Sequence, residues 1–274
     1  MSAAPALIAA YTVLAGAFGL VIGSFLNVVA YRVPAGIPLT RDSRCPACDG
    51  PVRAWQNVPI ASWLALRGRC AGCRAPISAR YPLVELVTAL AFAAIAAASL
   101  GSSSLPVGAT LIELVAYLYF AAVSVVLTLI DQDTRRLPNT IVLPSYLVAL
   151  VLFAAAVSAG ADPAALVRAV VAGLLLYLFY LVLRLARPDG MGGGDVKLAG
   201  VVGIYLGWLG WGAVAVGAFA AFVLGGVFGL ALMTLRRAGR RTAIPFGPWM
   251  LAGAWIGIFA GEALARGYTG LLSI

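Results

Sequence analysis

The sequence predicts an all-α polytopic membrane protein of about eight transmembrane helices, with a small cytoplasmic tetracysteine loop domain that binds zinc. Three observations predict this class. Of 274 residues, 62% are apolar and only 11% are charged, whereas a soluble domain is about 25% charged. The apolar residues form long runs of the length that crosses a bilayer. All four cysteines lie together in one loop.

The apolar runs cover residues 6–30, 82–100, 109–130, 140–160, 164–186, 196–212, 213–235 and 247–265. The sixth run gives the weakest signal, because it is rich in glycine and continues into the seventh through Gly207, Gly210 and Gly212. Bilayer helices tolerate such glycines, since neighbouring helices satisfy the backbone.

Basic residues predict the orientation, because cytoplasmic loops carry an excess of Lys and Arg. With the N-terminus outside, the inside loops are 31–81, 131–139, 187–195 with its flanks, and 236–246. Seventeen of the 19 basic residues then lie inside, and only Arg168 and Arg266 lie outside. This asymmetry explains the net charge of +9 without nucleic acid as a partner, and the basic loops would face anionic lipid headgroups.

Histidine is absent from the chain. This excludes the Ser-His-Asp and Cys-His nucleophile systems, His-ligated zinc hydrolysis and His proton shuttles. Acid–base chemistry must therefore come from Asp, Glu, Lys, Tyr, Cys or a metal-bound water.

The cysteines form two CxxC pairs, Cys45 with Cys48 and Cys70 with Cys73. Two such pairs are typical of a tetrahedral four-thiolate zinc site, which has no open position and is therefore structural. Metal binding would also supply folding free energy to a loop with few aliphatic residues. Redox-active dithiols and inert thiols are the alternatives.

Two acidic residues stand out. Asp131 directly follows an apolar run, and Asp195 ends the segment Gly190–Asp195 that opens the sixth run. Two spans separate them, so both return to the same membrane face. Two close carboxylates share a proton and can perform aspartyl-protease chemistry without histidine, and Gly192, Gly193 and Gly194 would let an extended substrate approach. Alternatively, the aspartates are ordinary juxtamembrane charges and the glycines a linker. Glu85 is expected to pair with a loop arginine.

Several ordered motifs accompany these residues, and together they span nearly the whole chain. They are residues 23–34 (GSFLNVVAYRVP), both CxxC pairs, Asn57–Pro59, Ser62–Leu64, residues 77–85 (ISARYPLVE), Asp131 with Leu137-Pro138, Gly190–Lys197 and residues 244–248 (IPFGP). The sequence resembles the type IV prepilin peptidases, a GxGD family of membrane aspartyl proteases that are also prepilin N-methyltransferases.

The resemblance implies that Asp131 and Asp195 are the catalytic aspartates, with Asp133 in reserve. Asn139 departs from the acid that usually follows Leu-Pro in the family. The implied reaction is cleavage of the basic leader of prepilins or secretion-system pseudopilins after glycine, at the cytoplasmic face of the bacterial inner membrane. N-methylation with S-adenosylmethionine is implied as a second activity. No residue could be assigned to the methyl donor.

We expect two parts. Residues 1–100 hold the first span, the CxxC domain and the second span, and residues 101–274 form the peptidase core. Three other functions remain as alternatives. They are a peptidase without methyltransferase activity, an ion-coupled transporter, since intramembrane acids often mark ion pathways, and a membrane thiol oxidoreductase.

Overall fold

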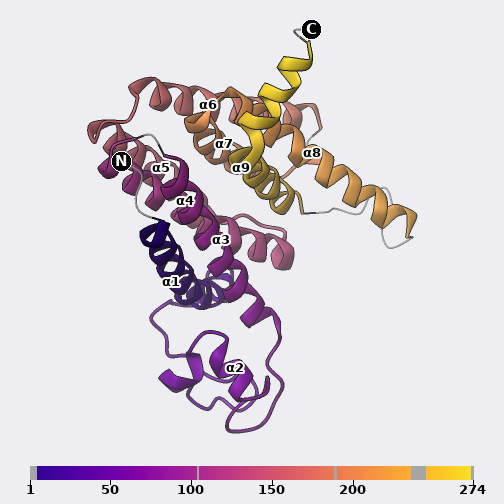
Figure 1. The fold of residues 1–274 in the computed structure, drawn as a ribbon. Coiled ribbons are helices and arrows are strands. Elements are labelled where there is room, and N and C mark those ends of the chain that lie inside the picture. The colour runs from indigo at the N-terminus through magenta and orange to yellow at the C-terminus, as the bar shows by residue number, and fades with distance from the viewer. Residues whose placement is uncertain (1–4, 104, 188–189, 236–244, 273–274) are drawn as a thin grey trace. The chain divides into compact units, whose positions relative to one another are not determined.

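The computed structural model describes residues 5–103, 105–187, 190–235 and 245–272, and in these residues it contains helices and no β-strand. The long helices are α1 (Pro5–Arg32), α3 (Arg80–Ser102), α4 (Val107–Thr134), α5 (Asn139–Ser158), α6 (Pro163–Ala186), α7 (Gly193–Leu209), α8 (Trp211–Thr234) and α9 (Gly247–Leu272), shown in Figure 1. Two short helices, η1 (Ala54–Asn57) and α2 (Ala61–Ala65), lie in the cysteine loop. The prediction of an all-α polytopic protein is confirmed. The four arginines of the fourth basic loop, Arg236, Arg237, Arg240 and Arg241, lie outside the described residues.

Seven of these helices are long and apolar enough to cross a membrane, and α7 falls short of that length. With 17 residues, it spans about 26 Å at 1.5 Å per residue, against a hydrocarbon core of about 30 Å. Apart from Lys197, every residue from Asp195 to Trp208 is buried. A helix that is apolar on all sides belongs inside a bundle, so the weak sixth signal in the sequence comes from a short helix enclosed by its neighbours.

The chain divides into two compact units. Unit 1 comprises Met1–Ser104 and Tyr117–Val126, and unit 2 comprises Leu105–Ala116 and Leu127–Ile274.

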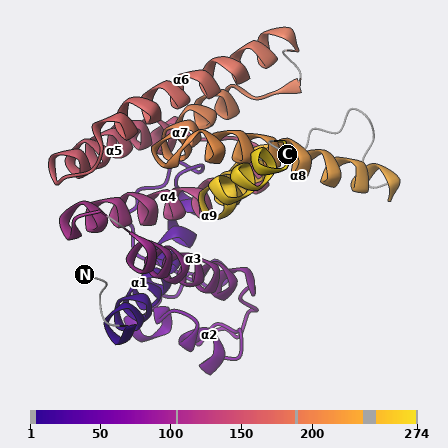
Figure 2. The ribbon, with the colours of Figure 1, turned by 45° about the horizontal axis from the view of Figure 1, so that its top comes forward.

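In unit 1, α1 and α3 pack against each other in antiparallel directions (Figure 2). Small residues permit the close approach. A Cβ on Gly19 would lie 2.7 Å from the Cα of Ala89, and one on Gly23 would lie 2.7 Å from the Cα of Glu85. Larger side chains would force these helices apart.

Arg32, the last residue of α1, organises the loop that follows. Its buried guanidinium donates to the carbonyls of Leu39 at 2.9 Å and of Arg41, and to Ser43 Oγ at 3.4 Å. Backbone carbonyls rather than a carboxylate therefore satisfy this cation. The same hydrogen bonds hold the first residues of the cysteine loop against the end of α1.

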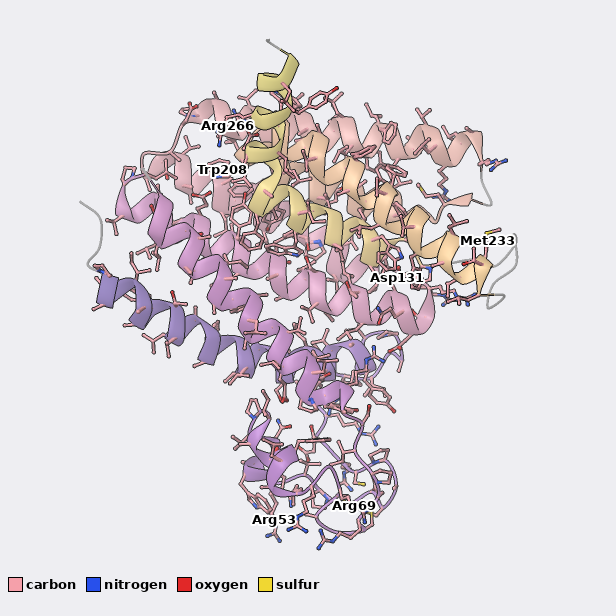
Figure 3. All side chains as sticks on the ribbon, turned by 45° about the vertical axis from the view of Figure 1, so that its right-hand side comes forward. Arg53, Arg69, Asp131, Trp208, Met233 and Arg266 are labelled. Atoms are coloured by element: carbon pink, nitrogen blue, oxygen red, sulfur yellow. The ribbon has the colours of Figure 1, made fainter. Side chains whose placement is uncertain are left out.

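In unit 2, α7 packs mainly against α6, with α5, α8 and α9 also in contact (Figure 2). Glycines again set the distance, since a Cβ on Gly203 would lie 2.6 Å from the carbonyl oxygen of Ala172. Figure 3 places Asp131 and Met233 at one end of this unit, and Trp208 and Arg266 at the other.

Charged side chains hold the Trp208 end. Arg168 donates from Nε to the Gly207 carbonyl at 2.7 Å and from Nη2 to the Trp208 carbonyl at 2.8 Å. Trp208 Nε1 donates to Glu113 at 3.1 Å, and Glu262 accepts the N–H of Ala213 at 3.1 Å. The last carbonyls of α7 thus meet a cation, which suits the negative end of a helix dipole.

Candidate active site and cysteine cluster

Asp131 lies in the last turn of α4 and is 5% exposed. The helix ends just beyond it, because Arg135 adopts a left-handed conformation (φ 53°) and donates its N–H to the Asp131 carbonyl at 2.9 Å. The side-chain Oδ2 accepts the N–H of Gly247, the first residue of α9, at 3.1 Å. A Cβ on Gly247 would lie 2.7 Å from this oxygen, so the contact requires glycine.

Asp195 lies in the first turn of α7 and is 9% exposed. Its Oδ2 accepts the N–H of Gly192, the residue that caps the helix, at 3.1 Å. A carboxylate at this position satisfies one of the unpaired N–H groups at a helix start and complements the positive end of its dipole. The sequence Gly192–Asp195 therefore fixes the carboxylate locally.

Leu137 connects the segments that carry the two aspartates. A Cβ on Gly194 would lie 2.8 Å from Leu137 Cβ, and a Cβ on Gly247 would lie 3.4 Å from Leu137 Cδ2. Gly247 carries the N–H that Asp131 accepts, and Gly194 directly precedes Asp195. The structure thus brings together the two aspartates named from the sequence, while their catalytic role stays a prediction.

The three glycines before Asp195 have neighbours from the chain itself. A Cβ on Gly192 would lie 3.0 Å from Asp195 Oδ2. A Cβ on Gly193 would meet the Arg184 guanidinium, and one on Gly194 would meet Leu137. Close packing therefore requires glycine at Gly194, whereas the end of the Arg184 side chain can move away from Gly193. The proximity of the three glycines to substrate stays a prediction.

Two other residues singled out from the sequence, Asp133 and Asn139, lie at the surface. Asp133, the reserve candidate, is exposed. Asn139, at the start of α5, accepts a hydrogen bond from Lys197 Nζ at 2.9 Å. The Tyr146 hydroxyl donates a hydrogen bond to the Lys197 carbonyl. These two bonds link α5 to α7 at Lys197, two residues after Asp195.

The four cysteines form a cluster in unit 1, in the loop that carries Arg53 and Arg69 (Figure 3). Two similar turns build it. Cys45 N–H donates to Gly50 O at 2.9 Å, and Cys70 N–H donates to Ala75 O at 2.8 Å. In each turn the residue after the second cysteine is left-handed, Asp49 with φ 53° and Arg74 with φ 61°.

The cluster fits a tetrahedral metal ion. All four Sγ atoms lie within 4.8 Å of one another, and Cys45 Sγ lies 3.8 Å from Cys73 Sγ. Zn–S bonds of about 2.3 Å place tetrahedral sulfurs about 3.8 Å apart. The N–H groups of Cys73 and Gly72 lower the pKa of Cys70 to about 6, which favours a thiolate ligand. The Ala75 N–H acts in the same direction on Cys73, but the Cys48 sulfur, burial and the other two sulfurs raise the pKa of Cys73 to about 11.

Glu85 differs from the expectation. Its buried carboxylate accepts the N–H of Ile60 at 2.7 Å and forms no ion pair with an arginine of the described residues. Ile60 precedes α2 and has φ 58°, which is unusual for a β-branched residue. No local sequence signal indicates this long-range bond. The contacts of Leu137 with Gly194 and Gly247 likewise have no local sequence signal.

These features define a class of protein, a polytopic helical membrane protein with two buried aspartates at one end of a helix bundle and a separate tetracysteine domain. Residues 17–99 match the family model of the bacterial peptidase A24 N-terminal domain, and residues 118–230 match that of the type IV leader peptidase family. The chain belongs to the type IV leader peptidase family.

Curated relatives agree along nearly the whole chain. A protein of Aeromonas hydrophila is 37% identical over 92% of this chain and 91% of its own length. A protein of Stutzerimonas stutzeri is 34% identical over 94% of each chain, and one of Neisseria gonorrhoeae is 36% identical over 92% of each. All three are named prepilin leader peptidase/N-methyltransferase. No solved structure matches the chain.

Proposed function

We propose that this protein is a bifunctional prepilin leader peptidase and N-methyltransferase of the bacterial inner membrane. Membership of the family and the names of relatives that cover more than nine-tenths of the chain support this function. The observation that carries the peptidase mechanism is the pair of buried aspartates in unit 2, Asp131 in the last turn of α4 and Asp195 in the first turn of α7.

Each proposed catalytic carboxylate has one fixed oxygen and one available oxygen. Oδ2 of Asp131 accepts from Gly247, and Oδ2 of Asp195 accepts from Gly192. Neither Oδ1 has a partner among the described residues. One carboxylate therefore takes a proton from water through its available oxygen, while the other, protonated, faces the scissile carbonyl.

The reaction proceeds by addition and elimination. The hydroxide bonds to the carbonyl carbon, and the carboxylic acid gives its proton to the carbonyl oxygen. The carboxylate that took the proton from water then gives it to the peptide nitrogen as the C–N bond breaks, and one hydroxyl of the tetrahedral carbon returns its proton to the other carboxylate. The products are a carboxyl end on the leader and a free amine on the mature protein. Gly192, Gly193 and Gly194 lie beside the substrate backbone in this proposal.

Cys45, Cys48, Cys70 and Cys73 would hold a structural zinc ion, which would supply folding free energy to their loop. S-adenosylmethionine would supply the methyl group for the new amine. We assign the metal domain with the first and second spans to residues 1–100, and the peptidase core to residues 101–274. The N-terminus would lie outside, with the aspartates facing the cytoplasm, because the basic loops would then be inside. A second candidate, the ion-coupled transporter, has no support from the comparisons.

Asp131→Asn and Asp195→Asn test the mechanism, because an asparagine oxygen still accepts the glycine N–H. Each should lower leader cleavage by about 100- to 10,000-fold, the size of general acid–base catalysis. Asp133→Asn is the matched control and should cleave at the wild-type rate. Mass spectrometry of a coexpressed prepilin reads cleavage, its position and the added methyl group together. Cleavage at the wild-type rate by either aspartate variant would remove that residue from the mechanism.

A further inference from the structure

Glu85 is a buried carboxylate without a cation. It is 7% exposed, it lies in α3 where α1 packs against it, and none of the described Lys or Arg residues forms an ion pair with it. The other described acids of unit 1 differ, since Asp42 and Asp49 are exposed and Asp49 pairs with Arg44 at 3.1 Å. An ionised carboxylate away from water is costly unless a cation or several donors meet it.

One oxygen of this carboxylate is occupied and the other is available. Oε2 accepts the N–H of Ile60 at 2.7 Å. Oε1 has no partner in the described part of the chain, and it is not among the enclosed atoms sealed from solvent. The carboxylate therefore keeps one acceptor that is not sealed from solvent.

A second acceptor lies one helical turn away. Asn27 donates from Nδ2 to the carbonyls of Tyr81 at 3.2 Å and Gly23 at 3.3 Å. Tyr81 precedes Glu85 by one turn of α3, and Gly23 packs on the Glu85 backbone. Both amide hydrogens of Asn27 are thereby engaged, which leaves its Oδ1 as an acceptor without a donor among the described residues.

An uncompensated carboxylate with a second acceptor one helical turn away suits a primary ammonium group, which has one positive charge and three N–H donors. Hydrogen bonds to a charged group are also the strong ones. We propose that Glu85 and Asn27 bind the α-ammonium group of an amino-acid ligand used in methyl transfer. This inference rests on the proposed N-methyltransferase function and gives that function a site in unit 1.

Two ligands carry this group, the new N-terminus of the cleaved substrate and the amino-acid part of the methyl donor. The full-length protein tests both, with Glu85→Gln as the variant, because its carboxamide oxygen still accepts the Ile60 N–H. The first arm compares binding of a pre-cleaved prepilin peptide with that of its N-acetylated form. The second arm measures binding of S-adenosylhomocysteine, which has the ammonium but no methyl group to transfer.

Wild type should bind one of these probes about 10- to 100-fold more tightly than Glu85→Gln does, as expected for one charged hydrogen bond. Loss confined to the free-amine peptide identifies the substrate terminus, and loss confined to S-adenosylhomocysteine identifies the donor. Asp49→Asn, in the loop that carries Ile60, should bind both probes like wild type. Equal binding of both probes by wild type and Glu85→Gln would overturn the proposal.

Two further measurements separate this proposal from other failures. Glu85→Gln should cleave prepilin within about twofold of wild type and keep its metal content. If Glu85→Gln loses metal together with probe binding, Glu85 acts through the loop fold and the proposal is overturned. Asn27→Ala leaves the Glu85–Ile60 bond in place, and it should weaken binding of the same probe while the metal content stays that of wild type. A wild type that binds the probes but transfers no methyl group refutes the proposed methyltransferase function and leaves ammonium binding in place.

Discussion

Leu137 occupies the space beside Gly194 that any other residue would need for its side chain, because a Cβ on Gly194 would lie only 2.8 Å from Leu137 Cβ. This contact joins the segment after α4 to the start of α7. It therefore sets how close the backbone of Asp131 comes to that of Asp195.

Gly194→Ala should lower leader cleavage by about tenfold or more, since overpacking costs about 1–3 kcal/mol and displaces one aspartate. Gly226→Ala is the control, because a Cβ there would meet nothing within 4 Å. The cleavage rate of a prepilin peptide is the measurement.

The double variant Gly194→Ala with Leu137→Ala should recover part of that rate, because the smaller side chain returns the space. If the double variant is as slow as the product of the single effects, the two residues do not interact.

Arg168→Leu should destabilise the protein by about 2–3 kcal/mol, because two carbonyls at the end of α7 lose a charged donor. The transition in a thermal unfolding scan should fall by about 5–10 °C. Arg266→Leu serves for comparison, since Arg266 is exposed. An equal shift in both variants would mean that the cap contributes nothing specific.

Asn139→Asp should leave cleavage intact and stabilise the fold by about 0.3–1 kcal/mol, because the Lys197–Asn139 hydrogen bond becomes an ion pair. Stability is measured by denaturant unfolding. In the Lys197→Met background the same change should bring no gain, and a gain there would attribute the effect to something other than this pair.

Purified protein should contain about one zinc ion per chain, and Cys73→Ser should abolish it, because four thiolates complete the tetrahedron. Elemental analysis after mild reduction gives the zinc content. Zinc unchanged in Cys73→Ser, or disulfides that cycle without metal, would favour thiol redox chemistry.

The membrane fold and the cysteine cluster could be predicted from the sequence because both follow from local patterns. Each apolar run predicts one helix without information from the rest of the chain, and each CxxC pair places two metal ligands in one turn. The return of Asp131 and Asp195 to the same end also follows from counting helices. The bond from Ile60 to Glu85 could not be predicted, since it joins residues 25 positions apart through a backbone group. The contacts of Leu137 depend in the same way on how α4, α7 and α9 pack.

The enclosure of α7 has a consequence for biogenesis. α7 has only 17 residues, and nearly all of its surface contacts protein in the folded chain. On its own it is short for a stable transmembrane helix. It should therefore enter the membrane together with α6, whose backbone its glycines contact. Asp195 would then reach its final position only after these helices have assembled, so a partly synthesised chain would be unable to cut other proteins in the membrane.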